Sequence, residues 1–248
     1  MGESCTDVFV YGNVTRLAPE GPVPVLNPET ECRFPGMAAN VRKNVIALLN
    51  ENYLSDNVTL ISNNPESLVT KTRFVEKISN HLLLRVDAND KSYGRIDYSN
   101  INFDDYDAVI ISDYNKGLIS ENEILEISMN HPVTILDTKK ILGDWALKCA
   151  FIKINENEFE KTKSVMPDGI ENKLIVTMGA LGARWRNKEF PVENVERKDT
   201  SGAGDTFVAA FTVKYVKCRN IEDSIRFANR CATDVIQQRG TATPRFRC

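Results

Sequence analysis

Asp199-Thr200-Ser201-Gly202-Ala203-Gly204-Asp205-Thr206 is followed at once by an apolar segment with helical spacing, residues 207–216. Small residues ahead of a helix leave backbone N–H groups free to bind an anion, and the helix dipole favours negative charge at the same place. A bare glycine-x-glycine pattern more often marks an ordinary loop, but acidic residues flank this one on both sides. The stretch therefore predicts a phosphate-binding turn.

Asp205 stands at the rim of this predicted turn. A carboxylate there would repel a bound phosphate unless it accepts a proton from the group that attacks the phosphate. The placement of Asp205 therefore predicts phosphoryl transfer to a hydroxyl. The alternative is an ordinary loop that leads into an acidic first helical turn, which the helix dipole also favours.

Composition limits the class of protein. The chain has 248 residues, enough for one large α/β domain or two small ones. Its 31 basic and 34 acidic residues give a net charge of −3, which predicts neither a nucleic-acid nor a membrane surface. No apolar run reaches the ~18 residues of a membrane-spanning helix and no signal peptide is evident, so we expect a cytoplasmic protein. The six cysteines lack a Cys-x-x-Cys pair and are expected to be reduced thiols.

The second half of the chain has a regular strand and helix pattern. Continuous apolar runs typical of buried strands recur at residues 108–112, 133–137, 151–154 and 174–178. Between the first two, Ser120 and Glu123 form a capping box for a helix. The pattern predicts a parallel sheet with ligands at the carboxyl ends of its strands, which places Asp113, Asp137 and Lys139 near one rim.

The first part of the chain is rich in proline. Prolines that alternate with apolar residues fit an edge hairpin or a lid better than a central strand. Shorter strand-like runs are expected at residues 58–62, 71–75 and 82–86. Lys71, Arg73 and Arg85 either gather around a phosphorylated substrate, since arginine matches phosphate geometry, or form a solvated strand face.

Two helix starts carry candidate ligand residues. Residues 34–37 form a glycine turn that leads into a helix over residues 38–49, where Asn40 would offer a donor and an acceptor. A plain turn is an equal alternative. Asn155 and Glu158 follow a buried strand and face the same side of a first helical turn. Glu158 would then hold Mg²⁺ through water, or the pair only caps the helix.

Several of these motifs resemble those of the ribokinase-like carbohydrate kinases, the PfkB family. Residues 199–205 are similar to the family signature, and Asn155-x-x-Glu158 to its N-x-x-E motif. Thr177-Met178-Gly179 resembles its T-x-G nucleotide-binding turn, and Asn229 falls in the late helix that walls the adenine pocket in that family. The resemblance spans nearly the whole chain.

The resemblance implies an α/β, ribokinase-like fold with a mostly parallel central sheet flanked by helices. It implies one kinase domain over residues 1–248, with a small β-rich lid from about residues 10–35 and 70–87. By similarity, Asp205 is the general base, and the amides of Gly202, Ala203 and Gly204 stabilise charge on the transferred phosphoryl group. The other expected site residues are Asn155, Thr177, Gly179, Gly182, Asn229 and Lys139 for ATP, Glu158 for Mg²⁺, Asp7, Asn13, Gly36 and Asn40 for the sugar, and Lys71, Arg73 and Arg85 for its phosphate.

Within the family, the likeness is strongest to the kinase domains that phosphorylate D-glycero-D-manno-heptose 7-phosphate at O1, on the route to ADP-heptose. Residues 16–25 are similar to that group's R-I-S-P-E-A-P-V-P-V lid, and residues 35–41 to its P-G-G-A-A-N-V motif. The resemblance therefore implies ATP-dependent formation of the 1,7-bisphosphate. Exposed apolar lid edges often pair between subunits, so we expect a homodimer through the lid.

Three departures from the family pattern bear on the acceptor. Met37 replaces the second glycine of the sugar-binding pair, which would put a thioether near the sugar. The strand that normally ends before Gly2 is absent, and the segment between Ser62 and Lys71 is shorter than usual. None of the three touches the phosphate turn. Two alternatives therefore stay open: a kinase of another sugar or a nucleoside, and a non-catalytic homologue that binds a nucleotide or a sugar.

Overall fold

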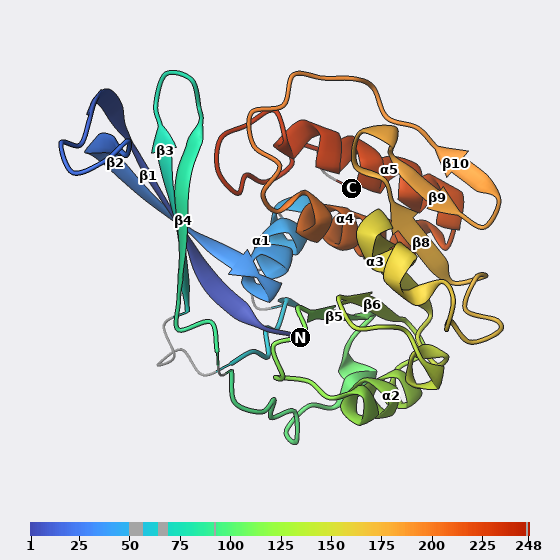
Figure 1. The fold of residues 1–248 in the computed structure, drawn as a ribbon. Helices are drawn as coiled ribbons and strands as arrows, with labels where there is room; N and C mark the ends of the chain where they lie inside the picture. Colours follow the sequence, from blue (N-terminus) through green and yellow to red (C-terminus); the bar gives the residue numbers. More distant parts are fainter. Residues whose placement is uncertain (50–56, 64–68, 92, 247) are drawn as a thin grey trace.

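The larger of two β-sheets forms the centre of the molecule (Figure 1). The computed structural model describes residues 1–49, 57–63, 69–91, 93–246 and 248. The strands of the larger sheet are β5 Val109–Asp113, β6 Thr134–Thr138, β7 Phe151–Asn155, β8 Leu174–Thr177, β9 Ala183–Trp185 and β10 Lys188–Phe190. Their order is β10-β9-β8-β7-β6-β5. Strands β5 to β8 are parallel to one another, whereas β9 pairs antiparallel with both β8 and β10. The four predicted apolar runs thus form the parallel part of the sheet.

Helices cover both faces of this sheet. They are α1 Ala38–Leu48, α2 Glu121–Asn130, α3 Glu156–Thr162, α4 Ala203–Cys218 and α5 Ile221–Val235, with short 3₁₀ turns at Phe103–Asp105, Asp144–Ala146 and Gly179–Leu181. Neighbouring strand residues point to opposite faces. Ile135 and Phe151 therefore pack with α1, α4 and α5, whereas Leu136 and Ile152 pack with α2 and α3. The result is the predicted α/β architecture, in which helices flank a mostly parallel central sheet.

Short-range signals set several helix starts. α2 begins with the predicted capping box, in which the Ser120 hydroxyl accepts from Glu123 N at 3.3 Å and the Glu123 carboxylate accepts from Ser120 N at 2.7 Å. The side chain of Asn220 caps α5 by accepting from Asp223 N at 3.1 Å. Each cap satisfies backbone N–H groups that have no partner inside the helix.

The smaller sheet, here called the lid sheet, projects from one side of the α/β part (Figure 1). Its strands are β1 Ser4–Leu17, β2 Pro24–Met37, β3 Thr70–Glu76 and β4 Leu82–Ala88, in the order β2-β1-β3-β4. β1 pairs antiparallel with β2 and parallel with β3. The proline-rich strand β2 lies at an edge of the sheet, as its composition predicted, because proline cannot donate to a central ladder.

The prediction of a strand at residues 58–62 is wrong. Gly2 N donates to Ile61 O at 3.1 Å, but the next strand-side donor, Ser4 N, is taken by the Asn63 side chain at 2.7 Å. A ladder therefore does not continue along this segment. The predicted shortening before Lys71 involves residues 64–68, which lie outside the described residues.

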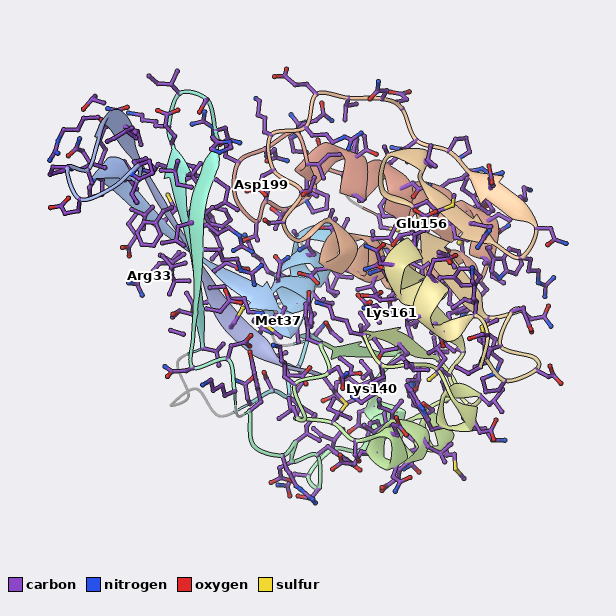
Figure 2. The ribbon with its side chains drawn as sticks, viewed as in Figure 1. Arg33, Met37, Lys140, Glu156, Lys161 and Asp199 are labelled. Carbon is purple, nitrogen blue, oxygen red and sulfur yellow. The ribbon has the colours of Figure 1, made fainter. Side chains whose placement is uncertain are left out.

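The prediction of a glycine turn at residues 34–37 is also wrong, since these residues continue β2 up to the start of α1. Gly36 lies opposite Cys5 in the β1–β2 ladder. Met37 has a left-handed backbone, with φ of 59°, at the junction of the lid sheet and α1 (Figure 2). Its side chain is buried in the core cluster with Cys5 and Tyr93. The expected placement of its thioether near the sugar therefore gives way to core packing.

The first two residues lie against the edge of β5. The amino group of Met1 donates to Ile110 O at 2.7 Å, and Ser112 N donates to Met1 O at 2.8 Å. Gly2 forms a parallel bridge with Ser112. This short segment therefore pairs with the sheet edge at β5, where the family pattern has its first strand.

Two further features match the sequence. All six cysteines are free thiols, and Cys5, Cys149 and Cys231 are buried. No helix in the described ranges has both the length and the apolar character needed to cross a membrane.

Candidate active site

The predicted phosphate turn forms the start of α4. Gly202 is the N-cap residue and has a left-handed backbone with φ of 78°, which glycine adopts without strain. Asp199 braces the turn from outside, because its carboxylate accepts from Ser201 N at 2.8 Å and from Gly240 N at 3.2 Å (Figure 2). The first acid of the motif is therefore structural.

Backbone donors are available in this turn. Ala203 N donates to Thr200 O at 3.3 Å, so it is engaged inside the turn. Within the described ranges, the N–H groups of Gly202, Gly204 and Asp205 have no acceptor in the protein. Free N–H groups at a helix N-terminus form an anion-binding site. Two of the three amides predicted to contact phosphate are thus free to do so.

The glycines leave room for neighbouring polar groups. A Cβ atom at Gly202 would lie 2.6 Å from Asn40 Nδ2, and one at Gly204 would lie 2.9 Å from Lys153 Nζ. Both distances are shorter than real contacts of a Cβ atom. The two glycines therefore allow a side-chain amide and an ammonium group to approach the turn closely.

Lys153 brings a buried positive charge to this turn. Its side chain is 8% exposed, and Nζ lies 3.1 Å from both carboxylate oxygens of Asp137. Burial alone would lower the pKa of Lys153, but the Asp137 carboxylate outweighs it and the pKa is raised, so the ammonium stays charged. A positive charge at a helix N-terminus is unfavourable because of the helix dipole, and the Asp137 carboxylate compensates for it. The Lys153 ammonium and the helix N-terminus together suit a bound anion.

A cavity of about 330 Å³ opens beside the turn. The residues predicted to contact the nucleotide that line it are Asn155, Thr177, Gly179, Gly182 and Asn229. Gly204 and Lys153 lie at its border with the turn, and Phe207 adds an apolar wall. The volume falls within the range of pockets for small ligands. The structure thus brings five of the six predicted nucleotide residues to one cavity.

Two of these residues owe their positions to the backbone around them. Gly182 has φ of 91°, and a Cβ atom there would lie 2.1 Å from Phe190 O, so no larger residue fits. Asn229 is buried in α5 and donates to the same Phe190 O at 2.7 Å. Strand β10 therefore ties the glycine turn and the late helix together as two walls of the cavity.

Asn155 and Glu158 form a capping box at the start of α3. Asn155 Oδ1 accepts from Glu158 N at 2.9 Å, and Glu158 Oε2 accepts from Asn155 N at 2.7 Å. Their structural role is thus the N-cap that was one of the two predicted alternatives. Within the described ranges, Glu158 uses only this one oxygen in a hydrogen bond, and no group of three or more metal-binding side chains occurs.

Asp205 is buried at the third position of α4, and both its oxygens accept hydrogen bonds. Tyr114 Oη donates to Oδ1 at 2.6 Å, and Asn40 Nδ2 donates to Oδ2 at 2.9 Å. Burial raises the pKa of Asp205 to about 6, while the two hydrogen bonds oppose that rise. A carboxylate with this pKa is ionised at neutral pH and still basic enough to accept a proton.

A buried polar chain continues from Asp205 between α1 and α4. Asn44 Nδ2 donates to Asn40 Oδ1 at 3.1 Å, and Asn44 Oδ1 accepts from the Thr206 hydroxyl at 2.9 Å. The oxygen of Asn40 is thereby occupied, which orients its NH₂ group toward Asp205. Asn40, predicted to contact the sugar, is therefore also a direct partner of the proposed base.

Two ammonium groups lie over the ring of Tyr114, the residue that donates to Asp205. Lys139 Nζ lies 4.0 Å from the centroid of the Tyr114 ring, and Lys71 Nζ lies 5.7 Å from it. Lys139, predicted to contact ATP, is not among the residues that line the cavity. Burial lowers the pKa of Lys139, and the Glu158 carboxylate opposes this effect.

A group of charged residues lies on one face of the lid sheet. Asp7 pairs in register with Lys71, and the Asp7 carboxylate forms a 2.5 Å ion pair with Arg73. A Cβ atom at Gly36 would lie 2.4 Å from Asp7 Oδ2, so glycine is required beside this carboxylate. Four residues predicted to contact the sugar phosphate, Asp7, Gly36, Lys71 and Arg73, thus lie together near the lid's junction with α1.

Two predicted residues lie farther out. Arg85 is opposite Arg73 in the ladder but on the edge strand β4, where it pairs with Asp87. Asn13 donates to Glu29, and it is six positions beyond Asp7 on β1, or about 20 Å along an extended strand. The structure does not bring Asn13 to the group around Asp205.

Asp113, expected at the same rim of the sheet, is used structurally. It is buried, and it accepts from Lys140 Nζ at 2.6 Å and from the Thr138 hydroxyl. The sequence interpretation missed Tyr114, Lys153 and Asn44. A signal for Lys153 did exist, since it is a charged residue inside an otherwise apolar strand.

Comparisons with known proteins find carbohydrate kinases. Residues 137–246 match the model of the pfkB family carbohydrate kinases. Bifunctional protein HldE of Helicobacter acinonychis is 25% identical over 293 residues, which covers 98% of this chain and 63% of that protein. Bifunctional protein HldE of a Nitratiruptor species is 25% identical over 289 residues, covering 98% of this chain and 62% of that protein. The chain thus spans less than two thirds of the length of these relatives.

Solved structures share the fold at low sequence identity. Thermotoga maritima ribokinase superposes with a TM-score of 0.65 at 17% identity, covering 98% of this chain and 95% of that one. Methanocaldococcus jannaschii nucleoside kinase superposes with a TM-score of 0.67 at 17% identity, covering 99% and 93%. A carbohydrate kinase transfers a phosphoryl group to an alcohol oxygen, which is the reaction class predicted from Asp205. Residues 137–246 are therefore similar to the pfkB family carbohydrate kinases, and the chain has a ribokinase-like fold.

Proposed function

We propose that this protein is an ATP-dependent kinase that phosphorylates D-glycero-D-manno-heptose 7-phosphate at O1. The observation that carries the proposal is the position of Asp205. Its carboxylate accepts hydrogen bonds from Asn40 and Tyr114, and it lies in the first turn of α4, the helix that borders the cavity. A base at that boundary can serve an acceptor under the lid and a phosphoryl donor in the cavity. The whole chain acts as one kinase domain in this proposal.

The chemistry follows from the groups at the boundary. Asp205 takes the proton of the anomeric hydroxyl as its oxygen attacks the γ-phosphorus of ATP. The new O–P bond forms while the bond to the ADP oxygen breaks. The free N–H groups of Gly202 and Gly204 and the ammonium of Lys153 then offset the negative charge on the transferred phosphoryl oxygens.

ATP fits the cavity beside the turn. Its lining includes Thr177, Gly179, Gly182 and Asn229, on the walls tied together by β10, with an apolar side from Phe207. A structural neighbour, Arabidopsis thaliana ribokinase, was solved with ribose and ATP, at a TM-score of 0.64 and 14% identity. ATP is a cytoplasmic metabolite, so the proposal includes a cytoplasmic location.

Mg²⁺ is part of the proposal through Glu158. Magnesium beside phosphates is commonly bound through one or two carboxylates, with water and phosphate oxygens as further ligands. Glu158 lies at the start of α3 and retains a carboxylate oxygen outside its capping box, so a single-carboxylate site fits these residues. When bound, the ion would neutralise phosphate charge.

The phosphorylated end of the acceptor would meet the basic face of the lid sheet. Lys71 and Arg73 are partly or fully buried and lie beside Asp7, and Arg85 extends the same face to the edge strand. Arginine forks match the geometry of a phosphate group. This face supports a phosphorylated sugar over a neutral one. A different phosphorylated sugar stays the second candidate, because the face itself selects phosphate rather than heptose.

A non-catalytic role receives less support from the structure. That alternative rested on Met37 and on the missing first strand, but the Met37 side chain packs in the core and Met1 and Gly2 pair with β5. The hydrogen-bonded Asp205 carboxylate, the free amides of the turn and the charged Lys153 support a catalytic role instead. The geometry therefore favours a working phosphotransfer site.

We include a homodimer through the lid sheet in the proposal. The outer face of β4 exposes Leu82, Leu84 and Val86, at 49%, 56% and 43% of their full areas. These residues alternate along the strand, so they lie on one face of an edge strand. An apolar face of this kind is suited to pairing with a second copy.

Coupled release of ADP tests the function. The purified protein is incubated with ATP and Mg²⁺ and, in separate reactions, with heptose 7-phosphate, other sugar phosphates and nucleosides. The proposal expects the highest kcat/KM with heptose 7-phosphate. Turnover only with another acceptor would correct the substrate, and no ADP release with any acceptor, despite measurable ATP binding, would indicate the non-catalytic alternative.

A further inference from the structure

Tyr114 is a residue of the site to which the sequence analysis gave no role. It follows β5, and its hydroxyl donates to Asp205 Oδ1 at 2.6 Å. Asn40 Nδ2 holds the other carboxylate oxygen at 2.9 Å. The Asp205 carboxylate is therefore gripped from two elements, the loop after β5 and helix α1.

These two hydrogen bonds leave Asp205 able to accept a proton. Each carboxylate oxygen can accept two hydrogen bonds. The two protein donors use one position on each oxygen and fix the plane of the group, so the remaining positions have a defined direction. A fixed carboxylate loses less entropy when it receives a proton from an acceptor in the site.

Tyr114 is built to remain a donor. Burial and the neighbouring Asp205 carboxylate raise the pKa of Tyr114 well above its ordinary value, so the phenol keeps its proton at any working pH. Lys139 and Lys71 contact the ring, at 4.0 Å and 5.7 Å from its centroid, and hold it from two other elements. Contacts on the ring keep it in place when only the hydroxyl is removed.

The titratable groups around Asp205 come from several neighbouring elements. Asp137 on β6 raises the pKa of Asp205, and Lys153 on β7 lowers it. Burial lowers the pKa of Lys139, which follows β6, and the Asp205 charge opposes that effect. Burial also raises the pKa of Cys5 on β1 to about 12, with smaller contributions from Asp7 and Asp205. The ionised groups among these act on Asp205 through their charge, whereas Tyr114 and Asn40 donate hydrogen bonds directly to its carboxylate.

We propose that Tyr114 is a positioning residue of the phosphotransfer site: its hydroxyl orients the Asp205 carboxylate and stabilises the ionised form that accepts the proton. This inference rests on the proposed function, because it assigns the hydroxyl a task in that reaction. A hydrogen bond to a charged acceptor is equivalent to roughly one to two pKa units. Loss of the hydroxyl therefore moves the ionisation of Asp205 toward higher pH.

The test compares Tyr114→Phe with the wild-type protein over pH 5 to 9, a window of about two units on each side of neutrality. The variant keeps the ring beside its lysine neighbours and lacks only the hydroxyl. In the kcat/KM profile for the sugar phosphate, we expect the acidic limb to move up by about one pH unit. Activity at pH 9 should return to within about tenfold of wild type, and ATP affinity should be unchanged.

Tyr98→Phe is the matched control, because the Tyr98 hydroxyl donates at 3.1 Å to Glu126 at the surface. Its pH profile should coincide with that of the wild-type protein. If Tyr114→Phe lowers kcat/KM equally at every pH, or changes nothing, Tyr114 has no influence on the ionisation of the base and the inference is overturned.

A second measurement does not depend on turnover. Carbon-13 NMR of carboxyl-labelled aspartate, with Asp205→Asn used to assign the signal, gives the pKa of Asp205 in each protein. A higher pKa in Tyr114→Phe supports the inference, and the same pKa in both proteins overturns it. If the wild-type protein transfers no phosphate to any acceptor while the NMR shift is present, the proposed function fails and the contact between Tyr114 and the carboxylate stands.

Discussion

Replacing the buried Asp205 by asparagine should remove turnover and stabilise the fold at the same time. Burial raises the pKa of this carboxyl from 3.8 to about 6. The difference of about two pKa units corresponds to ~3 kcal/mol of free energy, at about 1.4 kcal/mol per unit. Because the pKa is raised in the folded state, the protonated carboxyl costs the fold nothing below about pH 4. As the pH rises through 6 the carboxyl ionises in its buried position, and the free energy of unfolding falls.

Asparagine has nearly the same shape and carries no charge, so Asp205→Asn lacks this pH-dependent cost. We expect its free energy of unfolding to exceed that of the wild-type protein by up to ~3 kcal/mol at pH 8. The gap should shrink as the pH falls from 6 to 4. Turnover should fall by about 10²- to 10⁴-fold, the usual contribution of a general base, while ATP affinity stays near the wild-type value.

Urea unfolding followed by circular dichroism at pH 5, 6, 7 and 8 measures the stability gap, a series that brackets the pKa within about two units. Coupled ADP release and calorimetric ATP titration supply the other two quantities. A gap that is absent, or that does not change with pH, would contradict the assignment of a buried, ionised carboxylate. Turnover at the wild-type rate would refute the role of Asp205 as the base.

Three further substitutions test other parts of the site. In Gly204→Ala the new Cβ would lie 2.9 Å from Lys153 Nζ, so we expect a displaced ammonium and kcat lower by about 10- to 100-fold in the ADP-release assay, with an unchanged circular dichroism spectrum. Met37→Gly relieves a left-handed backbone but empties a core position, so unfolding in urea should show a loss of about 1–3 kcal/mol, and acceptor turnover should not rise. Leu84→Asp should convert a dimer to monomer in light scattering, whereas Val165→Asp, at a 60% exposed position away from the lid sheet, should not; a wild-type monomer would remove the dimer from the proposal.

Patterns of short range were enough to predict most of the elements. The apolar runs became β5 to β8, and the Ser120 and Glu123 capping box starts α2 as expected. The glycine-rich turn ahead of α4 was predicted for the same reason, since helix ends and turns depend on residues within about four positions of one another. The wrong predictions fall at residues 34–37 and 58–62, where pairing with β1 and the Asn63 side chain overrode the local signals.

The residue types of the site were readable in the sequence, but their contacts were not. Asp205 was identified from its neighbours in the chain, whereas its partner Tyr114 is 91 positions away and meets it only because β5 and α4 pack together. The surroundings of Met37 were also not readable in the sequence. The family motif implied a thioether near the sugar, but the left-handed backbone of Met37 directs its side chain into the core. Sequence by itself determined most of the elements and the glycine-rich turn before α4, because those follow from interactions along a few residues. The tertiary structure alone decided which side chains surround Asp205, because contacts between distant segments depend on how the sheets and helices pack.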